Sequence, residues 1–237
     1  MTDDAALRAL IDAASVPYRA AGRFAWRFAR GKLGGDPAFA AILAQGLLAG
    51  RARILDLGCG RGLLASWLLA ARDAEIAGRW PRGWPQAPAP ERLLGVELDP
   101  REVARARAAL GERLHVVHGD IGNVDYATVD AIVMLDVLHY NDYAAQEAVL
   151  ARARAALSPG GVLLLRVGDA EGGVGFGVSK LVDRAVVLVR QHRLARLWCR
   201  PAREWHGLLA RLGFSTSALP MSAGTPFSNV LLVGRLP

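Results

Sequence analysis

A chain of 237 residues with 52% hydrophobic residues fits one α/β domain and is too short for two large ones. Its net charge of +7 invites a nucleic-acid function, but nearly all of that charge is arginine, since Lys32 and Lys180 are the only lysines. No basic tract interleaved with aromatic residues stands out, so nucleic acid is kept only as an alternative substrate. Two cysteines, Cys59 and Cys199, exclude a disulfide framework and favour a reducing compartment.

The chain starts Met-Thr-Asp-Asp, which is acidic where a signal peptide is basic. It has no apolar run approaching the roughly 18 to 20 residues of a membrane span. We therefore expect a soluble, cytoplasmic protein, and we predict no metal site.

Strand and helix patterns alternate along the chain, as in a doubly wound parallel sheet. Residues 1–50 predict helices that precede the sheet, and residues 74–91 predict an extended insertion rich in Pro and Trp. The predicted strands are 53–57, 92–98, 114–118, 130–135, 162–167, 214–219 and 229–235. The predicted helices include 62–72, 100–110 and 143–157, with Asp99 as the N-cap of the second and a Ser-Pro-Gly-Gly turn at 158–161.

One domain over residues 1–237 accounts for this order. We divide it into an N-terminal helical cap (1–50), a ligand-binding core (51–167), a lid insertion (168–204) and a closing helix with a strand pair (205–237). Neither the oligomeric state nor the role of the 74–91 insertion follows from the sequence.

The most informative segment is Ile-Leu-Asp-Leu-Gly-Cys-Gly-Arg-Gly at residues 54–62. Apolar residues lead to Asp56, three glycines alternate at Gly58, Gly60 and Gly62, and an apolar helical run follows. Glycine adopts positive φ at little cost and lets a ligand lie against bare backbone, while a helix start offers unpaired N–H groups. The segment therefore predicts a strand, a tight turn and a helix that together form a ligand site.

This wording resembles the first motif of class I S-adenosylmethionine (SAM) dependent methyltransferases. Its glycine spacing differs from the G-x-G-x-x-G of dinucleotide binders, which argues against a nicotinamide-dependent oxidoreductase. The resemblance implies a seven-stranded, mostly parallel, Rossmann-like sheet with an antiparallel last strand. It also implies SAM as the cofactor and S-adenosyl-L-homocysteine as its product.

The resemblance further implies the residues that hold SAM, because ligands of open α/β sheets lie beyond the carboxyl ends of the strands. Glu97 would accept the ribose hydroxyls, Asp120 would contact the adenine amine, and Asp56 would meet the methionine end. The full predicted set is Tyr18, Arg23, Arg30, Asp56, Gly58, Cys59, Gly60, Glu97, Leu98, Asp120, Ile121 and Asp136, in which Tyr18, Arg23 and Arg30 are candidates for the cofactor's carboxylate. Three alternatives stay open: Asp120 simply starts a turn, Glu97 is a solvated carboxylate, and Asp56 accepts N–H bonds from the glycine turn.

The segment from Leu135 to Tyr140 follows the fourth strand and resembles that of small-molecule methyltransferases. It departs from the Asn-Pro-Pro-Tyr signature of amino-directed nucleic-acid enzymes. His139 is the candidate general base because an imidazole titrates near neutral pH, and Tyr140 is a candidate to position substrate. A histidine that packs to shape the cofactor pocket is the competing interpretation.

The lid insertion has an apolar helical pattern and clustered positive charge, supplied by Lys180, Arg184, Arg190, Arg193, Arg196 and Arg200. A solvated face is one interpretation, and docking of an acidic acyl carrier protein or a membrane surface is the other. Two sequence segments, at 18–26 and 219–227, resemble those of methyltransferases from bacterial aryl-polyene pathways. This resemblance implies a phenolic or aryl acceptor. A SAM-binding sensor or structural partner without transferase activity is the alternative from another class.

Overall fold

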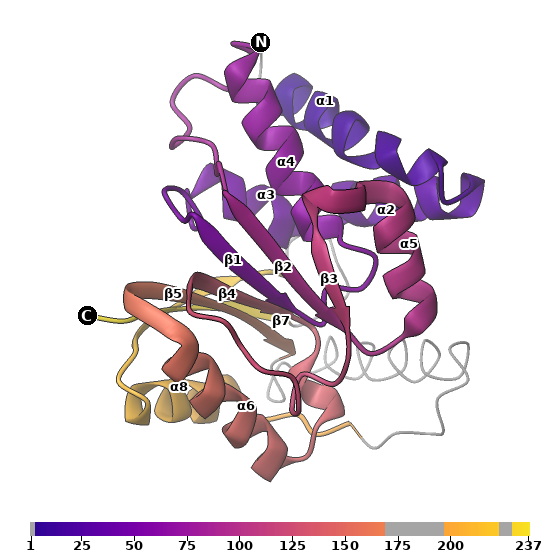
Figure 1. The fold of residues 1–237 in the computed structure, drawn as a ribbon. Coiled ribbons are helices and arrows are strands. Elements are labelled where there is room, and N and C mark those ends of the chain that lie inside the picture. Colours follow the sequence, from indigo (N-terminus) through magenta and orange to yellow (C-terminus); the bar gives the residue numbers. More distant parts are fainter. Residues whose placement is uncertain (1–2, 169–196, 223–228) are drawn as a thin grey trace. The chain divides into compact units, whose positions relative to one another are not determined.

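The computed structural model describes residues 3–168, 197–222 and 229–237. Seven strands form one sheet in the order β3-β2-β1-β4-β5-β7-β6, in which β7 runs antiparallel to both of its neighbours (Figure 1). This confirms the predicted fold class. The chain divides into two compact units, Met1–Val124 with Val129–Ala131 and Asp125–Thr128 with Ile132–Pro237, which we describe separately.

The first unit holds three parallel strands and the N-terminal helices. The strands are β1 (Arg53–Leu57), β2 (Arg92–Glu97) and β3 (His115–His118), together with the first residues of β4 (Val129–Leu135). The helices are α1 (Asp3–Ser15), η1 (Val16–Arg19), α2 (Arg23–Gly35), α3 (Pro37–Ala44), α4 (Leu63–Ile76), α5 (Pro100–Leu110) and η2 (Gly111–Arg113). The predicted cap is present, since the Asp99 carboxylate accepts the Arg101 N–H at 2.8 Å.

Helix α4 is the core of this unit. Its Trp67 is fully buried and donates its indole N–H to the Phe39 carbonyl at 2.8 Å. The Ser66 hydroxyl donates to the Ala14 carbonyl at 2.6 Å. A buried polar group needs such a partner, so these two bonds fix α3 and the end of α1 on the helix that follows the glycine turn.

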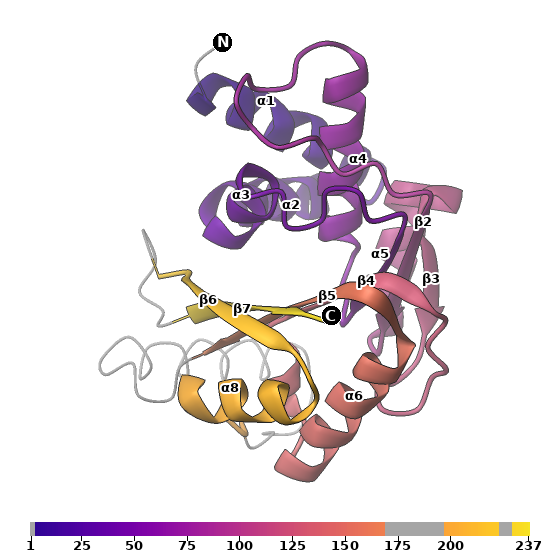
Figure 2. The same cartoon turned by 90° about the vertical axis from the view of Figure 1, so that its left-hand side faces the viewer.

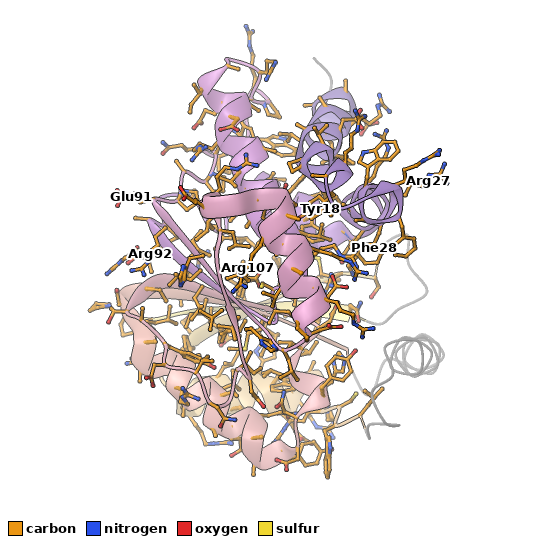
Figure 3. The ribbon with its side chains drawn as sticks, turned by 45° about the vertical axis from the view of Figure 1, so that its right-hand side comes forward. Tyr18, Arg27, Phe28, Glu91, Arg92 and Arg107 are labelled. Atoms are coloured by element: carbon orange, nitrogen blue, oxygen red, sulfur yellow. The ribbon has the colours of Figure 1, made fainter. Side chains whose placement is uncertain are left out.

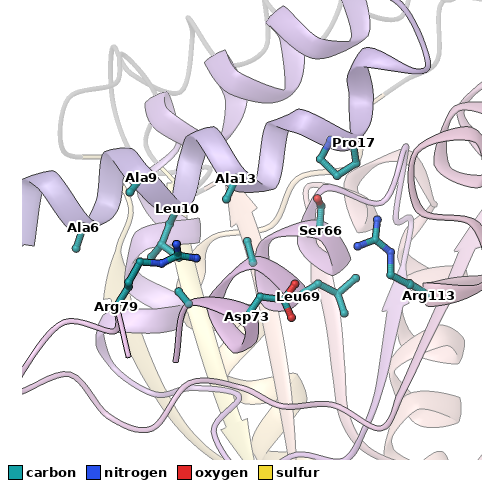
Figure 4. Close-up of a pocket in the computed structure, with 12 residues that line it drawn as sticks. Ala6, Ala9, Leu10, Ala13, Pro17, Ser66, Leu69, Asp73, Arg79 and Arg113 are labelled. Atoms are coloured by element: carbon teal, nitrogen blue, oxygen red, sulfur yellow. The ribbon is translucent and has the colours of Figure 1, made fainter. Parts of the chain in front are cut away.

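A cavity of about 280 Å³ lies between α1 and α4 (Figure 4). Its walls are mostly small apolar side chains such as Ala6, Ala13 and Ala70, with Asp73 and Arg113 among the polar ones. None of the predicted site residues belongs to its lining.

The second unit contains β5 (Leu157–Gly168), β6 (Ser215–Pro220) and β7 (Asn229–Arg235). Helices α6 (Tyr143–Ala156) and α8 (Ala202–Arg211) lie on one side of these strands, and η3 (Leu138–Tyr140) follows β4 (Figure 2). Among the described residues, no helix combines the length and the apolar character that a membrane crossing needs.

Two predicted ends of helices and strands differ from the structure by more than one residue. Helix α4 ends at Ile76 rather than residue 72, so the irregular insertion begins later than expected. Strand β5 begins at Leu157, so the predicted Ser-Pro-Gly-Gly turn lies within it, although Gly160 has φ 69° and the pairing with β7 runs from Val162. The Gly160 N–H donates to the carbonyl of Pro237, a partner at the far end of the chain that no local pattern reveals.

Candidate active site

The glycine turn between β1 and α4 is held from β2. The N–H groups of Gly58 and Cys59 donate to the Val96 carbonyl at 2.9 and 3.0 Å, and the Gly60 N–H donates to the Glu97 carboxylate at 2.8 Å. Gly58, Gly60 and Gly62 have φ of 76°, 55° and 79°, a region that favours glycine. The predicted turn therefore forms, and it exposes backbone at the carboxyl end of β1.

Asp56 does not accept N–H bonds from this turn, contrary to one of the sequence interpretations. In the described part of the chain no hydrogen bond reaches its carboxylate, which is 7% exposed. Burial, and next the charge of Glu97, raise the pKa of Asp56 to about 7. A buried carboxylate of this kind favours a cationic ligand, because a positive charge would repay its lost hydration.

Glu97 uses both of its oxygens in the protein. Oε2 accepts the Gly60 N–H and Oε1 accepts the Asp99 N–H, each at 2.8 Å. A carboxylate has about four acceptor sites, so each oxygen keeps capacity for a hydroxyl donor. Leu98, the next residue, is 57% exposed and offers an apolar surface at the same strand end.

Asp120 starts a turn, as the alternative interpretation allowed. Its carboxylate accepts the Gly122 N–H at 2.7 Å, and its carbonyl accepts the Asn123 N–H at 2.9 Å. Its side chain is nevertheless exposed after β3, and Ile121 beside it is buried. The turn is therefore compatible with the predicted contact to adenine, which stays a prediction.

Two of the three N-terminal candidates, Tyr18 and Arg30, have partners within the protein. Tyr18 is fully buried and donates its hydroxyl to the Arg61 carbonyl at 3.0 Å, while burial raises its pKa above the usual value (Figure 3). Arg30 forms an ion pair with Asp12, and Arg23 is exposed. Tyr18 thus stabilises the glycine turn, and its one proton is already donated within the protein.

The thiol of Cys59 is packed inside the protein, and only its backbone takes part in the glycine turn. The side chain is buried against Gly95. A Cβ added to Gly95 would lie 2.7 Å from the Cys59 sulfur. Burial and the charge of Asp56 raise the pKa of this thiol well above its usual range, so it stays protonated.

The sequence interpretation missed Arg61, which stands between the second and third glycines. Its buried guanidinium forms a two-pronged ion pair with Glu102 of α5 at 2.8 and 2.9 Å and lies 4.0 Å from the Phe28 ring of α2. Arg61 therefore ties the turn to two helices. A charged residue among the three glycines was the only signal in the sequence.

In the second unit, Asp136 follows β4 and has φ 58°, the only positive φ of a described residue other than glycine. Arg166 of β5, which is 2% exposed, donates Nε to Asp136 Oδ1 at 2.7 Å and pairs with Oδ2 through Nη2. The Asp136 carboxylate is thus engaged by a buried arginine. Sequence reasoning missed Arg166, because a lone arginine in a strand gives no sign of its partner.

His139 lies in η3 with 8% of its surface exposed, and its ring centroid is 4.2 Å from that of Tyr140, which is 38% exposed. Gln146 of α6 is fully buried, and its Nε2 lies 3.2 Å from the Leu138 carbonyl and 2.7 Å from the Trp198 carbonyl. The Trp198 N–H donates to the His139 carbonyl at 2.9 Å. The candidate base therefore belongs to a rigid, hydrogen-bonded turn.

The prediction that Arg200 belongs to an exposed, positively charged patch was wrong. It is buried, donates Nε to Gln146 at 2.9 Å, and pairs with Glu147 and Glu204. It therefore belongs to the interior of the second unit rather than to an open basic face. The other charged residues of the predicted patch, Lys180, Arg184, Arg190, Arg193 and Arg196, lie outside the described residues.

Comparisons with known proteins agree with the class that the fold and the turn define, the Rossmann-like methyltransferase fold. Residues 55–163 match the family model described as a methyltransferase domain, somewhat less than half of the chain. A carboxy-S-adenosyl-L-methionine synthase of Chromohalobacter salexigens is 39% identical over 140 residues, which are 54% of this chain and 47% of the relative. The chain thus matches about half of that relative's length.

Solved structures show the same fold. An O-methyltransferase family protein from Burkholderia thailandensis has a TM-score of 0.62 at 20% identity, covering 92% of this chain and 61% of its own. The magnesium protoporphyrin IX methyltransferase of Synechocystis PCC 6803, solved with bound S-adenosylhomocysteine, has a TM-score of 0.60 at 17% identity, covering 99% of this chain and all of its own. These likenesses show the fold, and the matched domain supports the prediction of a SAM-dependent methyltransferase.

Proposed function

We propose that this chain is a SAM-dependent methyltransferase that acts on a small molecule with a phenolic or aryl acceptor. The observation that carries the proposal is the glycine turn fixed to Glu97 beside the buried Asp56, whose carboxylate accepts no hydrogen bond from the described residues. This arrangement lies within the segment that matches the methyltransferase domain family.

Three carboxylates would each take one group of SAM. Asp56 would hold the ammonium, Glu97 would accept the two ribose hydroxyls, and Asp120 would accept the adenine amine. Leu98 offers apolar surface for the adenine ring, and the buried Ile121 would contact it through its backbone. When bound, SAM supplies an electrophilic methyl group with its leaving group already attached.

Two aromatic side chains of the first unit support an aromatic methyl acceptor. Phe24 is 72% exposed and Phe28 is 38% exposed, one turn apart on α2. Phe28 contacts Arg61, so this pair adjoins the glycine turn. An exposed ring such as that of Phe24 favours a flat aromatic ligand, since stacked rings are stabilised beyond their buried area.

For a phenol, the residues of this chain have two tasks: to align the oxygen and to accept its proton. We assign proton acceptance to the His139 imidazole and alignment to Tyr140. An acidic carrier protein that delivers the acceptor, as in the aryl-polyene group, is part of the same proposal. It depends on Arg190, Arg193 and Arg196, which the structure does not describe.

Titration calorimetry with SAM, S-adenosylhomocysteine and NAD tests the cofactor assignment. We expect the first two to bind and NAD not to bind. A panel of free phenols with methyl-labelled SAM then tests the transfer. Binding without transfer to any acceptor would favour the sensor alternative, whereas no binding would contradict the proposal.

A reaction on the cofactor itself is a second candidate, favoured by one finding. The 39% identical relative is named for making carboxy-S-adenosylmethionine. Mass spectrometry of the nucleoside that copurifies with the protein separates the two, because a carboxylated SAM is heavier than SAM or its demethylated product. Recovery of the carboxylated form would favour this second candidate.

A further inference from the structure

We propose that Arg166 is a positioning residue for the reaction: it holds Asp136 in a left-handed conformation so that the turn after β4 presents His139. This inference concerns residues of the second unit only and rests on the proposed function. Arg166 acts through Asp136 and is not itself assigned a contact with substrate.

The backbone at Asp136 is the first observation. Its φ of 58° lies in the left-handed region, which is unfavourable for a residue with a Cβ, although aspartate tolerates it better than most. Such a conformation persists only where its surroundings impose it, and strained residues concentrate at functional sites.

Arg166 contacts both the side chain and the main chain of Asp136. Arg166 contacts the Asp136 carboxylate through Nε and Nη2. Its carbonyl accepts the Asp136 N–H at 3.3 Å. The arginine fork fixes a carboxylate in orientation as well as in place. Arg166 therefore fixes both the side chain and the main chain of Asp136.

The Arg166–Asp136 pair lies directly before the turn that contains His139. Val137 is helical, with φ −116° and ψ −36°, and η3 begins at the next residue and contains His139. Gln146 fixes the far side of the same turn, since its Nε2 also lies 3.0 Å from the Asn141 carbonyl. With both sides of the turn fixed, the backbone that carries His139 is held in one place, and we infer that the conformation at Asp136 helps to set that place.

Stability alone does not account for the pair. Burying an arginine is costly, and replacing a buried ion pair by apolar side chains is often neutral or stabilising. Asp130, six residues earlier, forms the same type of two-pronged pair with Arg53 at the start of β4, but that arginine is 43% exposed. The Arg53 pair is therefore a matched control, with the same chemistry at the end of the strand away from His139.

The test compares Arg166→Lys, Arg166→Met and Arg53→Lys. Lysine keeps the charge but loses the fork, so Arg166→Lys should lower kcat about ten- to a hundredfold with a smaller change in KM for the acceptor. Arg166→Met should lower kcat further, and Arg53→Lys should leave kcat unchanged. A parental kcat in Arg166→Lys would overturn the proposal.

A measurement that needs no enzymatic activity tests the positioning role of Arg166 independently of the proposed function. In a histidine NMR titration, with the His139 signal assigned from His139→Gln, Arg166→Lys should shift that signal and its midpoint, whereas Arg53→Lys should not. An unmoved His139 signal in a folded Arg166→Lys protein would overturn the positioning role even if the parent is active. A parent that methylates nothing would contradict the proposed function and leave the NMR test intact.

The double variant Asp136→Gly/Arg166→Met distinguishes backbone positioning from direct use of the charges. Glycine adopts the left-handed conformation without a clamp, and both buried charges leave together. We expect kcat to recover relative to Arg166→Met. A folded double variant that remains as slow as Arg166→Met would show that the charged groups act directly, which would overturn the proposal.

Discussion

The carboxylate of Glu97 accepts the backbone N–H of Gly60 at 2.8 Å, so the residue that ends β2 fixes the turn that follows β1. Its other oxygen fixes the Asp99 N–H, at the start of α5. The residue proposed to hold the ribose is thus also part of the scaffold. Preorganisation of this kind reduces the ordering that a ligand would otherwise impose on the turn.

Glu97→Ala should weaken SAM binding at least tenfold, because one or two charge-assisted hydrogen bonds of about 1.5 to 3 kcal/mol each are lost. Glu97→Gln should weaken it less, since the amide keeps one acceptor oxygen. Calorimetry measures both, and Glu91→Gln, an exposed carboxylate just before β2, is the control. Unchanged affinity in Glu97→Ala would contradict the ribose assignment.

Asp56 should make the ligand-free protein less stable as the pH rises. Its pKa is about 7 in the folded state against 3.8 for an unperturbed aspartate, so between about pH 4 and pH 7 the folded state binds more protons than the unfolded state. Stability from this group is therefore greatest at low pH and is lost as pH rises through that window. Asp56→Asn should flatten this dependence in thermal melts and raise Tm at about pH 8.

The same substitution should have the opposite effect on the cofactor. The ionised carboxylate attracts the ammonium, so SAM affinity of the parent should increase as pH rises through about 7, and Asp56→Asn should bind SAM weakly at every pH. Calorimetry on both sides of this pH checks the dependence. Equal pH profiles in parent and variant would mean that another group titrates.

Phe24→Ala should raise KM for an aryl acceptor about five- to tenfold, the loss expected for one stacked ring, and should leave SAM affinity unchanged. Ile76→Ala is the control, because Ile76 is similarly exposed, at 78%, but lies at the end of α4. Steady-state kinetics measures both variants. Equal effects would show that the Phe24 ring is ordinary surface.

Gly62→Ala should destabilise the protein more than Gly78→Ala. Both glycines have positive φ, 79° and 67°, so both substitutions introduce backbone strain of about 1 kcal/mol or more. At Gly62 a Cβ would also lie 2.7 Å from a Leu114 methyl group, whereas at Gly78 nothing lies within 4 Å. The difference in the free energy of unfolding between the two variants therefore measures the steric clash, and equal values would contradict it.

His139→Gln should lower turnover by about 10² to 10⁴ while SAM binding stays close to that of the parent, if the imidazole accepts the proton. Binding and single-turnover rate are measured on the same preparation. A parallel loss of both would support the competing interpretation, in which His139 shapes the pocket.

The sequence by itself determined the elements whose causes are local. Alternating glycines at residues 58, 60 and 62 predicted the turn because each position requires a positive φ. Asp99 followed by Pro100 predicted a helix start, since both the cap and the fixed proline φ act within one turn of chain. Alternation of strands and helices predicted the sheet.

Only the tertiary structure decided which polar groups meet and which are buried. Arg61 pairs with Glu102 across 41 positions and Arg166 with Asp136 across 30, and neither separation has a periodicity that a sequence pattern reveals. Arg200 was expected on a charged face but lies buried against Gln146. The raised pKa of Asp56 likewise comes from desolvation, which depends on every atom packed around the carboxylate and on no single neighbour in the chain.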